Sequence, residues 1–169
     1  MSRFDFKPVD KEDLPLLYTW FELPHVKQWW PTPEEHEDFF GAFLERVRTG
    51  LRDVCLVFCD GKPIGYIQSY SVDITVDTWL PALPGTGTII GLDQFIGEPD
   101  YLYKGFGTLF IKEFIKRLIA QEKDVRVIVD PEPENVVAIR CYEKVGFKKL
   151  GVYQAPWGSV VVMVYQDSQ

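Results

Sequence analysis

Residues 88–129 contain the pattern that most restricts the fold. Residues 88–96 form an apolar, β-branched run that predicts a strand, and residues 105–121 carry apolar side chains at helical spacing. Residues 125–129 form a second short apolar run of the strand type. A strand, a glycine-bearing connection, a helix and another strand, in this order, indicate that one helix crosses a sheet between two of its strands.

The rest of the chain alternates between the same two periodicities. Further strands are predicted at 3–9, 54–58, 64–72, 147–153 and 159–165, and further helices at 14–21, 32–49 and 135–144. Asp10 and Asn135 are expected N-caps, and Asp60-Gly61 fits a tight hairpin turn. We therefore predict one α/β domain over residues 1–169, with a central mixed, mostly antiparallel sheet of about seven strands and about four helices on both faces.

Two connections are expected to be irregular. Pro24 is expected to end the helical pattern, which leaves residues 25–30 as an aromatic-rich connector. Residues 73–87 contain two prolines and two glycines, so they are expected to form a surface loop with an exposed Trp79. The turn around Trp157 joins the last two strands; its indole either packs on its own hairpin or offers a surface to flat ligands.

Composition excludes several classes of protein. The 18 basic and 25 acidic residues give a net charge of −7, which disfavours nucleic acid and suits a cationic small molecule, although the same charge also serves solubility. The chain has no apolar run long enough to span a bilayer and no signal-peptide pattern, so a cytoplasmic protein without a membrane partner is expected. Cys55, Cys59 and Cys141 lack metal-ligand spacing, so buried free thiols and no metal are expected.

Residues 102–108 connect a predicted strand to a predicted helix and are candidates for binding phosphate. Backbone N–H groups and the positive end of the helix dipole converge there, and Gly105 and Gly107 allow close approach of an anion. The Gly-Lys-Ser/Thr of a nucleotide-hydrolysing loop is absent, and Phe110 replaces the third glycine of the dinucleotide fingerprint. The loop by itself fits either a ligand-free connection or a site for another phosphate ligand.

A second block, residues 135–147 with the sequence NVVAIRCYEKVGF, supplies the specific signal. Together with the glycine loop it resembles the GNAT acetyltransferases. The resemblance implies the GNAT fold and acetyl-CoA as cosubstrate, with Asn135 on the pantetheine arm and Tyr142 near the thioester sulfur. The pyrophosphate would be held by Lys104, Gly105, Phe106, Gly107 and Thr108. Leu102 departs from the Gln or Arg of many members, which is tolerable because main-chain N–H groups do most of the holding.

The likeness extends over nearly the whole chain. Blocks at 18–20, 25–30, 63–70, 91–94 and 130–131 resemble the aminoglycoside 6′-N-acetyltransferases. Related siderophore-type enzymes usually carry histidine where this chain has Asp93. The resemblance implies acetylation of the 6′-amine of an aminoglycoside antibiotic, and hence resistance, by a monomer or homodimer. The alternatives are acetylation of a siderophore precursor, a polyamine or another small amine, and a non-catalytic GNAT module that binds CoA.

The implied acceptor site suits a rigid polycation, which calls for carboxylates and flat aromatic surfaces. The expected substrate contacts are Trp30, Gln68, Tyr70, Asp77, Trp79, Asp93 and Asp130. A surface or turn carboxylate is an equally ordinary role for Asp77, and Trp29 fits a core position better than a ligand contact.

Asp93 and Tyr142 are the expected catalytic residues. An ammonium has no lone pair, so Asp93 either takes the proton, directly or through water, or orients the amine. Phe95 and Ile96 lie on the same strand and are expected beside the cosubstrate, where a main-chain N–H near Phe95 would stabilise the oxyanion. Tyr142 would protonate the departing thiolate, although its helical spacing also fits a packed aromatic.

Overall fold

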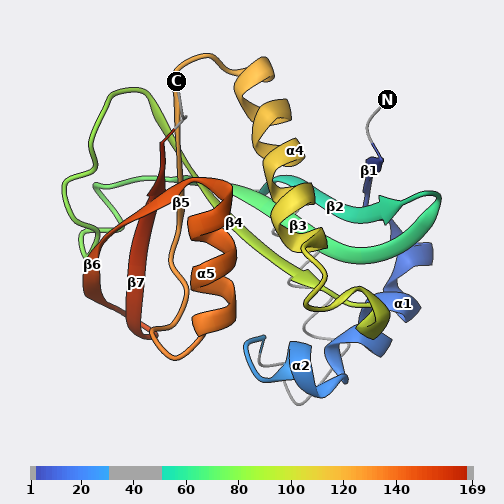
Figure 1. The fold of residues 1–169 in the computed structure, drawn as a ribbon. Helices are drawn as coiled ribbons and strands as arrows, with labels where there is room; N and C mark the ends of the chain where they lie inside the picture. The colour runs from blue at the N-terminus through green and yellow to red at the C-terminus, as the bar shows by residue number, and fades with distance from the viewer. Residues whose placement is uncertain (1–2, 31–50, 167–169) are drawn as a thin grey trace. The chain divides into compact units, whose positions relative to one another are not determined.

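The computed structural model describes residues 3–30 and 51–166 (Figure 1). Its strands belong to a seven-stranded sheet of order β1-β2-β3-β4-β5-β7-β6. The strands are β1 Phe4–Pro8, β2 Leu51–Cys59, β3 Lys62–Val72, β4 Thr88–Ile96, β5 Val125–Val129, β6 Phe147–Ala155 and β7 Gly158–Tyr165. The described α-helices are α1 Leu14–Phe21, α2 Pro24–Lys27, α4 Phe106–Gln121 and α5 Val136–Val145, with 3-10 turns at Lys11–Asp13 and Pro99–Tyr101.

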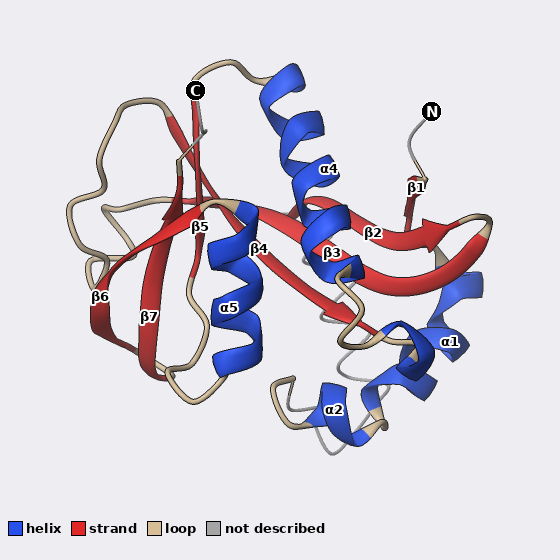
Figure 2. Cartoon of the chain, in the orientation of Figure 1, coloured by secondary structure: helices blue, strands red, loops and turns tan. Residues whose placement is uncertain are grey.

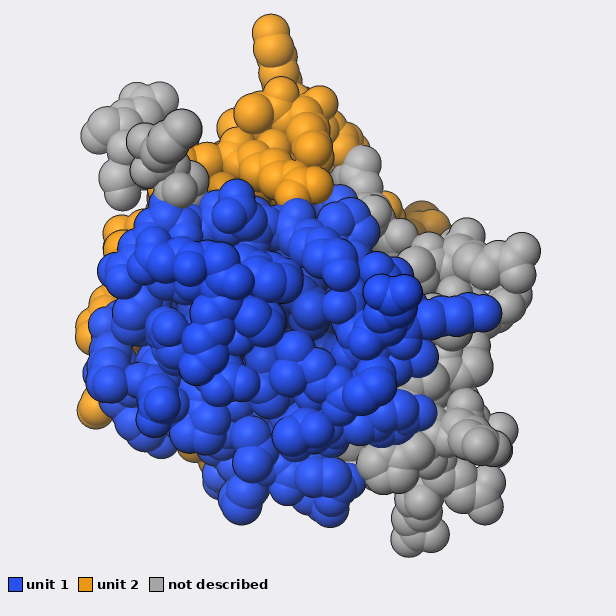
Figure 3. All heavy atoms as spheres, turned by 90° about the vertical axis from the view of Figure 1, so that its right-hand side faces the viewer, with its two compact units in different colours: residues 1–70, 93–106 blue, residues 71–92, 107–169 orange. Residues whose placement is uncertain are grey.

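The described chain divides into two compact units, each built from two separate stretches (Figure 3). Unit 1 comprises residues 1–70 and 93–106, and unit 2 comprises residues 71–92 and 107–169. Strand β4 therefore changes unit between Leu92 and Asp93. The single domain predicted over residues 1–169 stays a prediction, as does the placing of helices on both faces.

In unit 1, β1, β2 and β3 form an antiparallel meander (Figure 2). The β2–β3 turn has positive φ at both Asp60 (50°) and Gly61 (81°), the backbone that suits the twist of a two-residue hairpin. At Gly65 a Cβ would lie 2.5 Å from the carbonyl oxygen of Phe95, so glycine allows β3 and β4 to approach closely there. The apolar core of this unit is formed by Leu17, Trp20, Phe21, Val26, Val54, Leu56, Tyr66 and Phe95.

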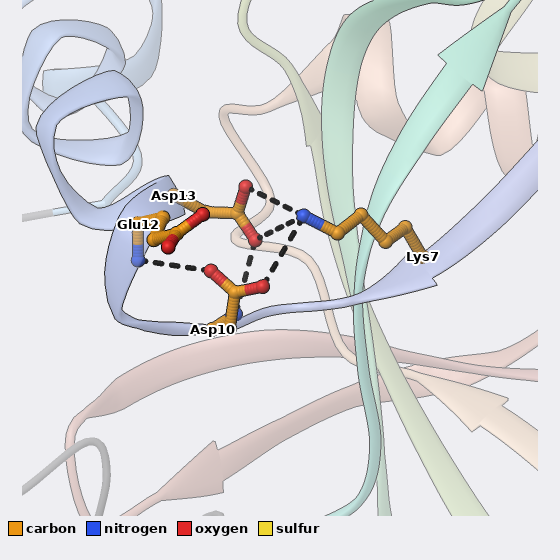
Figure 4. Close-up of polar contacts among 4 residues, drawn as sticks. All are labelled: Lys7, Asp10, Glu12 and Asp13. Carbon is orange, nitrogen blue, oxygen red and sulfur yellow. Dashed lines mark hydrogen bonds and ion pairs between the residues drawn. The ribbon is translucent and has the colours of Figure 1, made fainter.

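A capping box sets the start of the first helical segment (Figure 4). The carboxylate of Asp10 accepts from the N–H of Glu12 at 2.9 Å, and that of Asp13 accepts from the N–H of Asp10 at 3.0 Å. Lys7 lies 3.3 Å from Asp10 and 3.1 Å from Asp13, bridging both carboxylates. The expected N-cap at Asp10 is confirmed, and the motif is a structural one because its side chains satisfy one another.

In unit 2, β4 and β5 run parallel, with Thr88 paired to Val125 and Gly91 to Ile128. β5 pairs antiparallel with β7, and β7 pairs with β6 along their length. Helix α5 contacts β6 and leads directly into it (Figure 1). The helix begins at its N-cap Asn135 and ends at Gly146, where φ is 126°. The predicted mixed, mostly antiparallel α/β fold is confirmed, with β4–β5 as a parallel pair.

Three local predictions need correction. Pro24 follows the end of α1, as expected, but it also begins α2, so part of the predicted connector is helical. At the first position of a helix the missing N–H of proline costs nothing. Trp79 is half-buried, with its indole Nε1 fully buried, because the loop folds back onto the β6–β7 hairpin. Cys55 and Cys59 are buried free thiols as expected, but Cys141 is only half-buried. The predicted helix 32–49 lies outside the described residues.

Candidate active site

Asp93 is the titratable residue of β4, and its neighbourhood lies within unit 1. The side chain is half-buried, and Oδ2 accepts a hydrogen bond of 2.8 Å from Nε2 of Gln68 on β3. Burial raises the pKa of the Asp93 carboxyl above its ordinary value, and the Gln68 bond opposes this rise. Within the described residues, Oδ1 has no hydrogen-bond partner. One oxygen is thus anchored and the other is available to a ligand.

Tyr66 extends this arrangement by one residue. Tyr66 and Gln68 are two positions apart on β3, so their side chains leave the same face of the strand. The hydroxyl of Tyr66 donates to Oε1 of Gln68 at 2.6 Å. Burial, followed by the charge of Asp93, raises the pKa of Tyr66 well above its ordinary value. Tyr66 therefore stays protonated at any working pH and acts as a fixed hydrogen-bond donor.

An aromatic cluster surrounds the ring of Tyr66. Phe95 stacks on it with 5.3 Å between centroids and 14° between planes. Trp30 meets Phe95 edge-on at 5.2 Å and Tyr66 edge-on at 5.7 Å, and also contacts Phe21. Phe95 is buried and Trp30 is half-buried. Much of Trp30 is therefore used in packing, and its contact with a substrate stays a prediction.

The glycine loop has the backbone of a turn that leads into a helix. Tyr103 and Gly105 have φ of 59° and 83°, and within the described residues no heavy atom beyond the chain neighbours of Gly105 lies within 4 Å of the position that its Cβ would occupy. Gly107 and Thr108 lie in the first turn of α4, whose leading N–H groups have no acceptor inside the helix. Nζ of Lys104 donates a hydrogen bond of 2.7 Å to the carbonyl oxygen of Asp100. A glycine turn that leads into the N–H groups at the start of a helix fits a phosphate-bearing ligand.

Helix α5 carries two predicted residues of unit 2. Oδ1 of Asn135 accepts from the N–H of Ala138 at 3.2 Å, so this oxygen caps the helix and leaves the amide N–H₂ for other partners. Tyr142 is buried and packs edge-on against Phe147, with 5.5 Å between centroids. Tyr142 is thus a packed aromatic, and its part in catalysis stays a prediction.

The loop 73–87 holds two further candidates. Asp77 is half-buried, and no described group is hydrogen-bonded to its carboxylate. Trp79 meets Trp157 edge-on, with 5.3 Å between centroids, and Trp157 is 66% exposed. The turn tryptophan therefore contacts the loop instead of being buried on its own hairpin. Asp130 follows β5 and is half-buried, as is Tyr70 on β3.

Arg126 on β5 ties down the same loop. Its guanidinium donates to the carbonyls of Leu83 and Gly85, both at 3.3 Å, and of Gly87 at 2.8 Å. No local pattern in the sequence indicates this role of Arg126, because its partners lie about 40 residues earlier in the chain. Tyr66 was also missed, although its spacing of two from Gln68 in a predicted strand was a usable signal.

The predicted site residues divide between the units. Unit 1 contains Trp30, Gln68, Tyr70, Asp93, Phe95, Ile96, Lys104, Gly105 and Phe106; unit 2 contains Asp77, Trp79, Gly107, Thr108, Asp130, Asn135 and Tyr142. Among these residues, Gln68 is hydrogen-bonded to Asp93, and the ring of Trp30 packs edge-on against the ring of Phe95. Oγ1 of Thr108 lies 3.4 Å from the sulfur of Cys141. His25 contacts the carbonyl of Ile96 at 2.9 Å, which fixes the end of β4.

Two further observations bear on the kind of site. Across residues 3–30 and 51–166, no group of three or more His, Cys, Asp or Glu side chains is placed to hold a metal ion. No helix in this part of the chain has the length and apolar character needed to cross a bilayer.

Comparison with known proteins identifies the class to which this fold and site belong. The model of the acetyltransferase (GNAT) domain matches residues 10–155. The chain therefore belongs to the GNAT acetyltransferase family, and it is an enzyme of acyl transfer.

Within this family the chain is similar to aminoglycoside-modifying enzymes. Aminoglycoside N(6′)-acetyltransferase type 1 of Klebsiella pneumoniae is 31% identical over 160 residues, which cover 92% of this chain and 79% of the relative. The aminoglycoside acetyltransferase AAC(6′)-Ib, solved with coenzyme A and kanamycin, has a TM-score of 0.81 and 30% identity, covering 96% of this chain and 94% of that one. A structure of AAC(6′)-Ib with acetyl-CoA has a TM-score of 0.82 and 29% identity, covering 98% and 94%.

Proposed function

We propose that this protein transfers the acetyl group of acetyl-CoA to the 6′-amine of an aminoglycoside. The single observation that carries the proposal is the carboxylate of Asp93, anchored through one oxygen to Gln68 and available through the other. A half-buried carboxylate with a free oxygen is suited to bind an ammonium group and to receive its proton. The likeness to the Klebsiella enzyme and to the kanamycin complex supports the same acceptor.

The cosubstrate supplies an acetyl group activated as a thioester, and residues of the chain would hold its other parts. The main chain of Lys104, Gly105, Phe106, Gly107 and Thr108 would bind the pyrophosphate through N–H groups at the start of α4. Asn135 would bind the pantetheine arm through its amide N–H₂, since its oxygen caps α5. The main chain at Phe95 and Ile96 would lie beside the acetyl group.

The chemical step needs a sequence of proton transfers. The amine must first lose a proton, and each unit by which its pKa exceeds the pH costs about 1.4 kcal/mol. Asp93 takes this proton, directly or through water, or orients the amine while water takes it; the raised pKa of Asp93 favours the first role. The amine nitrogen then bonds to the carbonyl carbon, and the carbon–sulfur bond breaks as Tyr142 gives its proton to the departing thiolate. The new amide nitrogen loses its second proton, which returns to Tyr142 through solvent, and Asp93 releases the first proton to solvent.

The remaining predicted contacts suit a polycation. Asp77 and Asp130 would bind further ammonium groups, and Trp30, Tyr70 and Trp79 would offer apolar surfaces to the sugar rings. The net charge of −7 favours this substrate over nucleic acid. We further propose that the enzyme acts in the cytoplasm, as a monomer or homodimer, where both substrates would be available.

The decisive experiment compares neomycin with paromomycin, which differ in having a 6′-amine or a 6′-hydroxyl. Release of free thiol from acetyl-CoA is measured with each, and the acetylated product is located by mass spectrometry. We expect turnover with neomycin and none above background with paromomycin. Equal turnover of both would place the acetyl group on another amine and overturn the 6′ assignment.

A second panel separates the alternative functions. Polyamines and hydroxamate-precursor amines are assayed under the same conditions, and acetyl-CoA binding is measured by calorimetry. Activity on these amines but not on neomycin would favour a different acceptor. Acetyl-CoA binding without turnover of any amine would favour a non-catalytic module. Either result would overturn the proposed function.

A further inference from the structure

We propose that Tyr66 is a positioning residue that fixes the amide of Gln68 and, through it, the carboxylate of Asp93. The role given to Asp93 rests on the proposed function, whereas the contacts that connect the three residues lie within unit 1. The hydroxyl of Tyr66 lies 2.6 Å from Oε1 of Gln68, and Nε2 of Gln68 lies 2.8 Å from Oδ2 of Asp93. The three side chains form an unbroken line of two short hydrogen bonds.

Tyr66 determines which way the Gln68 amide faces. A glutamine amide has one accepting and one donating end, and its two orientations are related by a half-turn. Burial and the nearby charge of Asp93 keep Tyr66 protonated, so its O–H must donate and Oε1 must face it. The N–H₂ end then faces Asp93. The opposite orientation would bring the amide oxygen against a carboxylate and leave the tyrosine hydroxyl without this acceptor.

The tyrosine is itself held firmly, which a positioning role requires. Tyr66 is 1% exposed, and its ring stacks on Phe95 and meets Trp30 edge-on. A buried, stacked ring has little freedom to turn, so the position of its hydroxyl is set by the core. The line of hydrogen bonds thus transfers the rigidity of the aromatic cluster to the half-buried Asp93.

The chemical nature of Gln68, the middle residue of this line of hydrogen bonds, also matters. Gln68 is neutral, so it orients Asp93 without cancelling the negative charge that an ammonium substrate needs. A lysine or arginine in its place would compete with the substrate for the carboxylate. Within the described residues, Oδ1 of Asp93 stays free of hydrogen bonds, which leaves it for the acceptor amine. Among the described residues, the titratable groups whose charge bears on Tyr66 are Asp93 and the thiol of Cys55.

The test uses Tyr66→Phe, which removes one hydroxyl and keeps the ring. We expect kcat with neomycin to fall about 10-fold, the effect of losing one hydrogen bond in the line, while the KM for acetyl-CoA is unchanged. The acid limb of kcat/KM should move to higher pH, because the bond from Gln68 lowers the pKa of Asp93. Tyr153→Phe is the matched control, since Tyr153 is half-buried and its hydroxyl has no hydrogen bond within the described residues.

A second readout does not depend on activity. The free energy of unfolding is measured against pH for the wild type, Tyr66→Phe, Asp93→Asn and the double variant. The protonated carboxyl of Asp93 contributes stability, and this contribution is lost as the pH rises through the raised pKa of Asp93 in the folded state. In Tyr66→Phe this pKa should be higher still, so the loss should continue to higher pH. In the Asp93→Asn background, Tyr66→Phe should leave the pH dependence of the free energy of unfolding unchanged. Gln68→Met, which also breaks the line, should shift the same loss in the same direction.

The outcomes separate the two proposals. If neomycin is not acetylated but Tyr66→Phe shifts the titration of Asp93, the proposed function fails and the positioning role is supported. If neomycin is acetylated and neither the pH profile nor the unfolding titration moves in Tyr66→Phe, the positioning role is overturned. A fall in kcat shared equally by Tyr153→Phe would also overturn it, because the effect would then be a general loss of packing.

Discussion

At the scale of single residues, the surroundings of Asp93 suit its proposed role and carry a cost in stability. A half-buried carboxylate with one neutral hydrogen-bond donor is poorly compensated, which is why burial raises its pKa. The same lack of compensation leaves it able to accept a proton or to bind a cation. Such a residue serves folding less well than a neutral one would.

The substitution Asp93→Asn should therefore separate activity from stability. Asparagine can keep a hydrogen bond to Gln68 but cannot accept the amine proton, so we expect kcat/KM for the acceptor to fall about 100-fold or more. At pH 7 the variant should unfold at a higher denaturant concentration than the wild type. Steady-state kinetics and urea unfolding at pH 7 check the two effects, and unchanged kcat/KM would exclude both roles of Asp93.

The pH dependence of this stability difference has a definite sign. The folded pKa of Asp93 lies above the unfolded value of 3.8, so protonation favours the folded state. The contribution of Asp93 is fully present below pH 3.8 and is lost as the pH rises through the folded pKa. The advantage of Asp93→Asn should thus be small in acid and larger at neutral pH. A difference that grows toward low pH would contradict this assignment.

At the scale of elements, the start of α5 combines two tasks in one side chain. The oxygen of Asn135 caps the helix, and its N–H₂ is the part proposed to bind the cosubstrate. The two tasks use different atoms, so different substitutions separate them.

Asn135→Asp keeps a capping oxygen and removes the N–H₂, whereas Asn135→Ala removes both. We expect the alanine variant to lose about 1 kcal/mol of stability and the aspartate variant only a few tenths. Both should raise the KM for acetyl-CoA. Thermal unfolding and acetyl-CoA titration provide the measurements, and an aspartate variant with normal acetyl-CoA affinity would remove Asn135 from the cosubstrate site.

The loop 73–87 is held by one strand residue. Three carbonyls of the loop accept from the guanidinium of Arg126, a fork that lysine cannot reproduce. Because two proposed substrate contacts, Asp77 and Trp79, lie on this loop, its order would bear on the proposed acceptor site as well as on the packing against the β6–β7 hairpin.

Arg126→Lys should loosen the loop while the charge is kept. We expect faster proteolytic cleavage within residues 73–87, a several-fold higher KM for the aminoglycoside, and a loss of about 1 kcal/mol of stability. Arg140→Lys, an exposed position on α5, is the control. Equal cleavage of the loop in wild type and Arg126→Lys would show that the guanidinium does not hold it.

At the scale of the whole molecule, charge is the property that the entire chain contributes. A net charge of −7 attracts a polycation at a distance, and this attraction is screened by salt over about 10 Å at 0.1 M. The effect acts on encounter and is separate from the contacts made after binding.

We expect kcat/KM for kanamycin to fall about 10-fold between about 0.02 and 0.2 M salt. The control is 6-amino-6-deoxyglucose, whose single amine should give a much weaker dependence. Initial rates at low substrate concentration measure both. An equal salt dependence for the two acceptors would indicate that the net charge does not steer the substrate.

Local signals account for what could be predicted of the fold. The bounds of β4 and β5 agree with the apolar runs at 88–96 and 125–129, and the caps at Asp10 and Asn135 were recognisable from residue type. These features depend on neighbours within a few residues, which a sequence displays directly. The family could also be recognised, because residues 135–147 carry a specific pattern that the matching domain model confirms.

The sequence by itself thus determined the strands, the helices α1, α4 and α5, their order and the acetyltransferase family, and it offered Asp93 as a candidate. Only the tertiary structure decided what Asp93 touches: Gln68 is 25 residues away and Tyr66 two further, so their contact depends on how β3 and β4 lie together and on the chosen rotamers. The burial of Trp79, and the hydrogen bonds from Arg126 to the loop 73–87, likewise depend on the tertiary structure. Hydrogen bonds and packing between distant segments have no local pattern, because they exist only once the backbone has brought those segments together.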